Sequence, residues 1–163
     1  MQTIKDLKRH IPQVGRVEWI GLATERMADV ISHQTAEVKI GTGLEGEHHS
    51  KSGKGKRQVT MIQAEHLPVV ATLLGRESVG PEELRRNLVI SGINLTSLKK
   101  ARFTIGNVEF EGTGFCHPCS RMEHNLGDGG YAAMRGHGGI TTRVLSEGSI
   151  SVGDEVRFHP GES

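Results

Sequence analysis

The two cysteines, Cys116 and Cys119, carry the most reactive side chains of this 163-residue sequence and are spaced as Cys-x-x-Cys. That spacing occurs in half of a zinc site, in a redox dithiol and around a single reactive thiol. A zinc site needs two further ligands, and the candidates His124 and His137 match no common zinc spacing. A thioredoxin-like dithiol should precede a long helix, whereas a glycine-rich loop is expected here. We therefore expect no structural zinc and favour a reactive thiol.

Cationic residues surround the cysteine pair in the sequence. They are His117, Arg121, His124, Arg135 and His137. Positive charge favours the thiolate, which is both the nucleophile and the metal ligand. Pro118 ends the preceding strand and allows the chain to turn at Cys119. Because cysteines are often small buried hydrophobes, the alternative is a barrel whose two thiols are inert.

Three further segments combine cations with glycine and could bind an anion. The first is a loop whose glycines expose backbone N–H groups beside imidazole and cationic side chains; it contains Gly43, Gly46, His48, His49, Lys51, Lys54, Lys56 and Arg57. The second is 85–87 (Arg-Arg-Asn), where adjacent arginines at a helix end should point apart, so that at most one enters a given site. The third is 135–139 (Arg-Gly-His-Gly-Gly), where the backbone can approach a ligand closely. Solvated loops and a helix C-terminus would explain the same residues without a ligand.

The elements that must position these residues are mostly strands. Alternation of apolar and polar residues predicts strands over 14–22 and 35–40, and shorter ones at 58–62, 87–91, 140–145 and 155–159. Residues 103–105 and 108–111 should form a hairpin across Gly106-Asn107. Helices are expected over 64–74, from its apolar spacing, and over 81–86, which begins with Pro and two Glu. Residues 41–56 and 127–139 read as glycine-rich loops.

This pattern predicts a mainly β fold. We expect a closed or nearly closed β-barrel with two or three short peripheral helices, because closure removes exposed strand edges. The length fits a single domain over 1–163 with its core at about 14–158.

Charge and composition limit the class of partner. The formal net charge of +1 gives no electrostatic reason to expect nucleic acid or an anionic membrane as a partner. Apolar runs fall far short of the roughly 20 residues of a membrane helix, and no apolar signal-peptide core follows the polar N-terminus. We expect a soluble cytoplasmic protein with reduced cysteines.

The sequence resembles the MOSC family, named after the C-terminal domain of molybdenum cofactor sulfurase, in five motifs that occur in the family's order. Residues 43–49 resemble its Gly-Leu-x-Gly-Asp-x-His loop, with Glu47 where Asp is usual. Residues 57–62 with Glu65 resemble its Arg-Gln-Val-Thr-Leu-Ile strand. The others are 86–93, the strand before the cysteines at 106–119, and a closing hairpin at 138–156. Arg121 stands near a common Lys position, and both departures keep the charge.

The resemblance implies a barrel of the stand-alone bacterial type, with a cysteine that ligates the molybdenum of a pterin cofactor or carries sulfur. In members with a Pro-Cys dipeptide, the shared cysteine follows the proline, which corresponds to Cys119. Cys116 would be its partner or a bystander. The residues expected to contact the cofactor are Gly43, Gly46, His48, Arg57, Arg86, Asn87, Arg121, Arg135 and Gly138, with Arg57, Arg86 and the amides of 43–46 on its phosphate side.

Two activities follow from the resemblance. A molybdenum-binding module could reduce N-hydroxylated compounds, with electrons from an external electron-transfer protein. A sulfur carrier would instead accept a persulfide on Cys119 from a separate cysteine desulfurase. Such desulfurases use pyridoxal phosphate, a cofactor associated with the MOSC family as a whole.

Overall fold

The strand predicted over residues 14–22 is present with those bounds as β1 (Val14–Leu22), and alternate side chains along its first half are buried. The computed structural model describes residues 1–48 and 55–161. The remaining strands are β2 (Ile31–His33), β3 (Thr35–Lys39), β4 (Gly43–Leu44), β5 (Val59–Gln63), β6 (Leu88–Ser91), β7 (Arg102–Ile105), β8 (Val108–Phe115), β9 (Ile140–Val144), β10 (Gly148–Ser151) and β11 (Glu155–His159). The helices are α1 (Ile4–Lys8), α2 (His66–Leu73), α3 (Pro81–Leu84), α4 (Ser120–Leu126) and α5 (Gly130–Met134), with a 3-10 turn, η2, at Leu95–Leu98.

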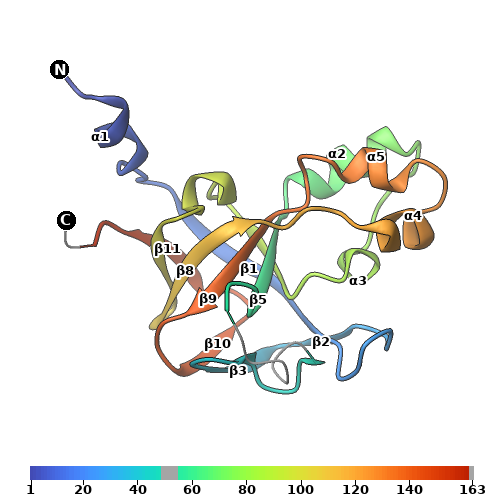
Figure 1. The fold of residues 1–163 in the computed structure, drawn as a ribbon, viewed down its shortest axis with the longest axis horizontal. Helices are drawn as coiled ribbons and strands as arrows, with labels where there is room; N and C mark the ends of the chain where they lie inside the picture. The colour runs from blue at the N-terminus through green and yellow to red at the C-terminus, as the bar shows by residue number, and fades with distance from the viewer. Residues whose placement is uncertain (49–54, 162–163) are drawn as a thin grey trace.

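Among the described residues, seven strands close into a barrel, as predicted. The order is β11-β7-β8-β9-β5-β6-β1, and β1 pairs back with β11 while β2 extends the sheet from β1. A register shift between Val17 and Trp19 interrupts the β1–β6 ladder, and such bulges bend a strand. Only β5 and β6 pair in parallel among the described strands, and the crossover between them carries α2 and α3. A separate sheet, β10-β3-β4, lies beside the barrel (Figure 1).

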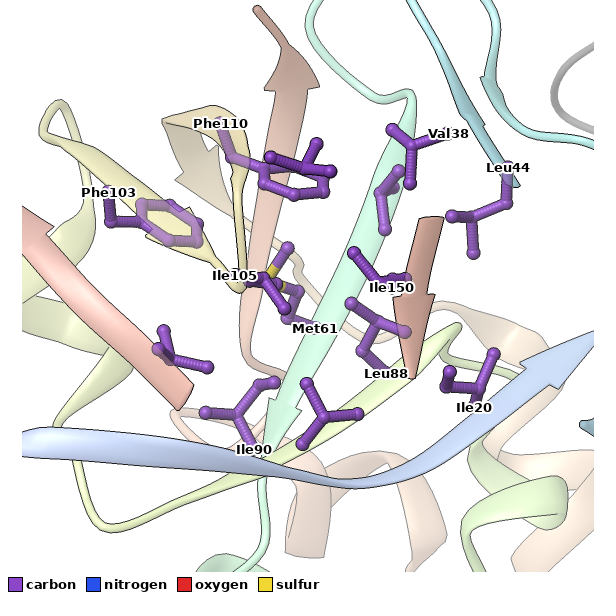
Figure 2. Close-up of a cluster of buried hydrophobic side chains, with 14 of the residues drawn as sticks. Ile20, Val38, Leu44, Met61, Leu88, Ile90, Phe103, Ile105, Phe110 and Ile150 are labelled. Carbon is purple, nitrogen blue, oxygen red and sulfur yellow. The ribbon is translucent and has the colours of Figure 1, made fainter. Parts of the chain in front are cut away.

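The barrel encloses an apolar core, and Figure 2 shows part of it. The rings of Phe103 and Phe110 stack across the β7–β8 hairpin with centroids 5.7 Å apart. The three-stranded sheet contributes Val38, Leu44 and Ile150 to the same core. Burial of these side chains, each contributing about 1.5–3 kcal/mol, holds the small sheet against the barrel.

A second apolar cluster joins the helices to the barrel. It contains Ile62 and Val89 from the strands, Val70 and Ala71 from α2, Leu84 from α3, Met122 and Leu126 from α4, and Ala133 and Met134 from α5. In Figure 1 these helices lie together on one side of the barrel. The same helices flank the cysteine segment, so this cluster fixes its surroundings.

The described residues contain five α-helices, more than the two or three expected. Residues 127–139 were predicted to be a loop but include α5, and α4 follows directly after Cys119. Both helices are too short to show a clear apolar period. Residues 148–151, expected as a turn, form β10, and Gly43 and Leu44 are buried in β4 rather than exposed in a loop. No helix in the described part of the chain is long and apolar enough to cross a membrane.

Candidate functional site

The cysteine segment places its two thiols in different environments. β8 ends at Phe115, and the backbone N–H of Cys116 donates to Gly139 O at 2.8 Å. The side chain of Cys116 is buried, with 1% exposed. Cys119 is exposed and is the N-cap residue of α4. Only Cys119 is therefore presented to a cofactor or reagent at the surface.

The two thiols should differ sharply in their rate of alkylation. Cys119 should react with iodoacetamide in the folded protein, whereas Cys116 should react only after local opening of the cysteine segment. We expect Cys116 to react at least about a hundredfold more slowly, which corresponds to an opening free energy of about 2.7 kcal/mol. Mass spectrometry of Cys119→Ser and Cys116→Ala, each with one remaining thiol, measures the two rates. Equally slow labelling of both would support the inert-thiol alternative.

Arg86 fastens the cysteine segment to the barrel. Its guanidinium is 4% exposed and donates to Gly138 O (Nε, 2.9 Å), Leu84 O (Nη1, 2.9 Å) and Cys116 O (Nη2, 3.4 Å). Burial lowers the pKa of the Arg86 side chain. The charges of Cys116 and Cys119 raise this pKa, and the charge of Arg57 lowers it. The side chain thus links the end of α3, the start of the cysteine segment and the loop before β9.

A buried polar network lies beside Arg86. Asn87 accepts from the backbone N–H of Thr60 at 3.1 Å and donates to Gly21 O at 3.2 Å and Glu47 Oε2 at 3.0 Å. Glu47, 3% exposed, also accepts from the backbone N–H of Ala23 at 2.8 Å. These bonds tie residues 21–23, 47, 60 and 87 into one rigid unit.

His48 is oriented by the same network. Its Nδ1 lies 2.6 Å from Glu47 Oε1 and 3.1 Å from Ala23 O. Because both neighbours accept hydrogen bonds, Nδ1 carries the proton. Glu47 therefore holds the imidazole ring in a defined orientation at the edge of the cavity that Cys119 lines.

That cavity, of about 570 Å³, gathers most of the predicted site residues. It is lined by Cys119, His48, Glu47, Asn87, His124 and five arginines, Arg26, Arg57, Arg85, Arg86 and Arg121. Glu47 is the only carboxylate among the described lining residues, so the cavity is strongly cationic. Its volume is within the range of small-molecule sites, about 300–1,000 Å³.

Arg85 and Arg86 both line this cavity, contrary to the expectation that at most one would. α3 ends at Leu84, and Arg85 adopts a left-handed backbone conformation with φ of 56°, which turns it toward the same side as Arg86. Its Nη1 donates to Ala28 O at 2.6 Å. Burial and the charge of Arg121 lower the pKa of Arg85.

The other predicted residues lie elsewhere. Arg135 and Gly138 line a second cavity, together with Cys116. Gly43 is in β4 and Gly46 in the following turn, and neither lines either cavity. His49, Lys51 and Lys54 lie outside the described residues. Sequence reasoning missed Arg26 and Met27, in a loop without periodicity; Met27 contacts Arg121.

His137, a candidate ligand in the sequence, packs against His66 at the start of α2. Their ring centroids are 5.1 Å apart, with an interplanar angle of 74°. His137 Nδ1 lies 3.0 Å from Ala133 O. Within residues 1–48 and 55–161, no group of three or more His, Cys, Asp or Glu side chains is arranged to hold a metal ion.

The His66–His137 contact should make stability depend on pH. Burial and the charge of His137 lower the pKa of His66 below its ordinary 6.5, although Glu65 opposes this. The unfolded chain then binds more protons, so the free energy of unfolding falls as the pH drops below about 6.5 and stops falling below the folded pKa. Urea unfolding between about pH 7.5 and 5 should show a shallower fall in His66→Gln than in the wild type. His10→Gln, in the exposed tail, is the control, and an identical slope in His66→Gln and the wild type would refute the effect.

Comparison with known proteins identifies the family and the fold. The sequence model of the MOSC domain family matches residues 45–157. No curated protein matches the chain. The YuaD protein from Bacillus subtilis is similar in structure, with a TM-score of 0.79 and 19% identity over 94% of this chain and 100% of that one. YiiM from Escherichia coli has a TM-score of 0.68 and 16% sequence identity, over 88% of this chain and 69% of that one. YiiM from Geobacillus stearothermophilus also has a TM-score of 0.68 and 16% identity, over 89% of this chain and 75% of that one.

Proposed function

The chain belongs to the MOSC domain family, and on that premise we propose that it binds a molybdenum cofactor with Cys119 as the protein ligand of the metal. The observation that carries the proposal is the exposed Cys119 on a cavity lined by five arginines. The family is associated with molybdenum cofactor binding and with sulfur transfer, and an arginine-lined cavity favours an anionic cofactor.

The donor set of the cavity fits such a group. A cysteine thiolate is a metal ligand, and arginine forks bind phosphate in a bidentate manner. Arg57 lines the cavity, and its side chain makes no hydrogen bond within the described part of the chain, so its guanidinium is available to the phosphate. Arg86 already donates to three carbonyls. When bound, molybdenum would supply two-electron redox chemistry, with electrons from an external donor.

The other residues would hold this site in place. Arg86 fixes the segment that carries Cys119, and the Glu47–Asn87 network fixes another part of the cavity wall and the orientation of His48. A prepositioned thiol and prepositioned cations lower the cost of ordering a ligand.

Metal analysis tests the proposal. The wild type, Cys119→Ser and Cys116→Ala are made in a host that synthesises the cofactor, and their molybdenum and pterin contents are measured. We expect near-stoichiometric molybdenum in the wild type, retention in Cys116→Ala, and a loss of more than about tenfold in Cys119→Ser, since even changes behind a metal ligand cost 10–100-fold. Circular dichroism confirms that each variant is folded.

Two results would overturn the proposal. One is a wild type that contains no molybdenum and takes up none from added cofactor. The other is full loading of Cys119→Ser. A persulfide on Cys119 after incubation with a cysteine desulfurase, in protein that never binds molybdenum, would assign sulfur transfer instead.

A further inference from the structure

A second cavity also borders the cysteine segment. Its volume is about 550 Å³. Its walls come from Thr96, residues 115–118, Tyr131, Arg135, Gly136, Gly138 and Gly139. None of the described residues lines both this cavity and the one at Cys119. Residues 116–118 line this cavity and Cys119 lines the other, so consecutive residues of one segment border two cavities of similar size.

Aromatic rings are exposed at this second cavity. Phe115 is 41% exposed and Tyr131 is 43% exposed, although both line a concave surface. By contrast, Phe103 and Phe110 in the barrel core are completely buried. Exposed rings on a concave surface are typical of ligand sites, because a planar ligand stacked on them removes apolar area from water.

The charge around these rings is positive. The Lys99 ammonium lies 4.2 Å from the centroid of the Phe115 ring. Arg135 and His117 are exposed and line the cavity, and the described lining residues include no Asp or Glu. A negatively charged ligand is therefore attracted, and Arg135 can form a bidentate pair with a phosphate or sulfonate.

We propose that the second cavity binds a planar aromatic anion, with Phe115 and Tyr131 against its ring and Arg135 on its acidic group. The proposal does not depend on what Cys119 binds, because the two cavities have separate walls. It assigns a role to Arg135 that differs from the cofactor contact expected from the sequence.

Binding of matched anionic and neutral probes tests the proposal. The probes are flavin mononucleotide with riboflavin as its neutral counterpart, and 1-naphthyl phosphate with 1-naphthol. Titrations followed by probe fluorescence compare the wild type with Tyr131→Ala, Arg135→Ala and Cys119→Ser. Arg102→Ala, an exposed arginine on β7, is the control for general loss of positive charge.

We expect at least one anion to bind more tightly than its neutral counterpart. Tyr131→Ala should weaken both members of that pair about tenfold, as loss of one stacking partner does elsewhere. Arg135→Ala should remove the preference for the anion, while Arg102→Ala and Cys119→Ser bind like the wild type. Absence of saturable binding by both anions up to about 1 mM, or binding that neither Tyr131→Ala nor Arg135→Ala changes, would overturn the proposal. Loss of binding in Cys119→Ser would show that the probes occupy the Cys119 cavity instead.

Discussion

Arg86→Ala is expected to lower the free energy of unfolding by about 3 kcal/mol. The buried guanidinium donates to the carbonyls of Leu84, Cys116 and Gly138, and alanine leaves all three without that donor. Hydrogen bonds from a charged group contribute about 1.5–3 kcal/mol each, and release of the buried charge offsets part of the sum. Urea unfolding at neutral pH measures the difference.

Two further variants separate the hydrogen bonds from the charge. Arg86→Lys keeps the charge but lacks the planar fork, so it should recover less than half of the loss. Arg57→Ala removes an exposed arginine of the same cavity and should change stability by less than about 0.5 kcal/mol. If the free energy of unfolding of Arg86→Ala lies within about 0.5 kcal/mol of the wild-type value, Arg86 does not anchor the cysteine segment.

The parts of the fold that sequence reasoning predicted are those with a long local pattern. β1 alternates over enough residues for the period to be clear, and the β7–β8 hairpin contains its own turn at Gly106-Asn107. α4 and α5 have seven and five residues, so neither completes more than two turns. Their position is set by burial of Met122 and Met134 in the second apolar cluster, which is a tertiary effect.

The candidate site was predictable in its residue types more than in its geometry. Cys119, Arg57 and His48, which the resemblance assigned to one cofactor, line one cavity. The carbonyl partners of Arg86 are brought to it only by the fold, and the shared direction of Arg85 and Arg86 follows from a single left-handed residue. Arg135 belongs to a different cavity because α5, which the sequence did not reveal, carries it away from Cys119.

Gly139→Ala is expected to lower the free energy of unfolding by about 2–5 kcal/mol, a large fraction of the total stability of a typical domain. A Cβ at residue 139 would lie 1.8 Å from the backbone O of Met61 in β5, and φ is +84°. The left-handed backbone alone costs about 1–2 kcal/mol, and the overlap adds about 1–3 kcal/mol. Neither the β5 backbone nor residue 139, whose carbonyl accepts from Cys116 N–H, can move without loss of pairing.

Gly136→Ala provides the matched control in the same loop. Its φ is +81°, nearly that of Gly139, but nothing lies within 4 Å of an added Cβ. It should therefore show the backbone cost alone, about 1–2 kcal/mol. Thermal unfolding and the soluble yield of the two variants measure the contrast. Equal losses in both would mean that backbone conformation, and not close packing of this loop on β5, determines the need for glycine beside the cysteine segment.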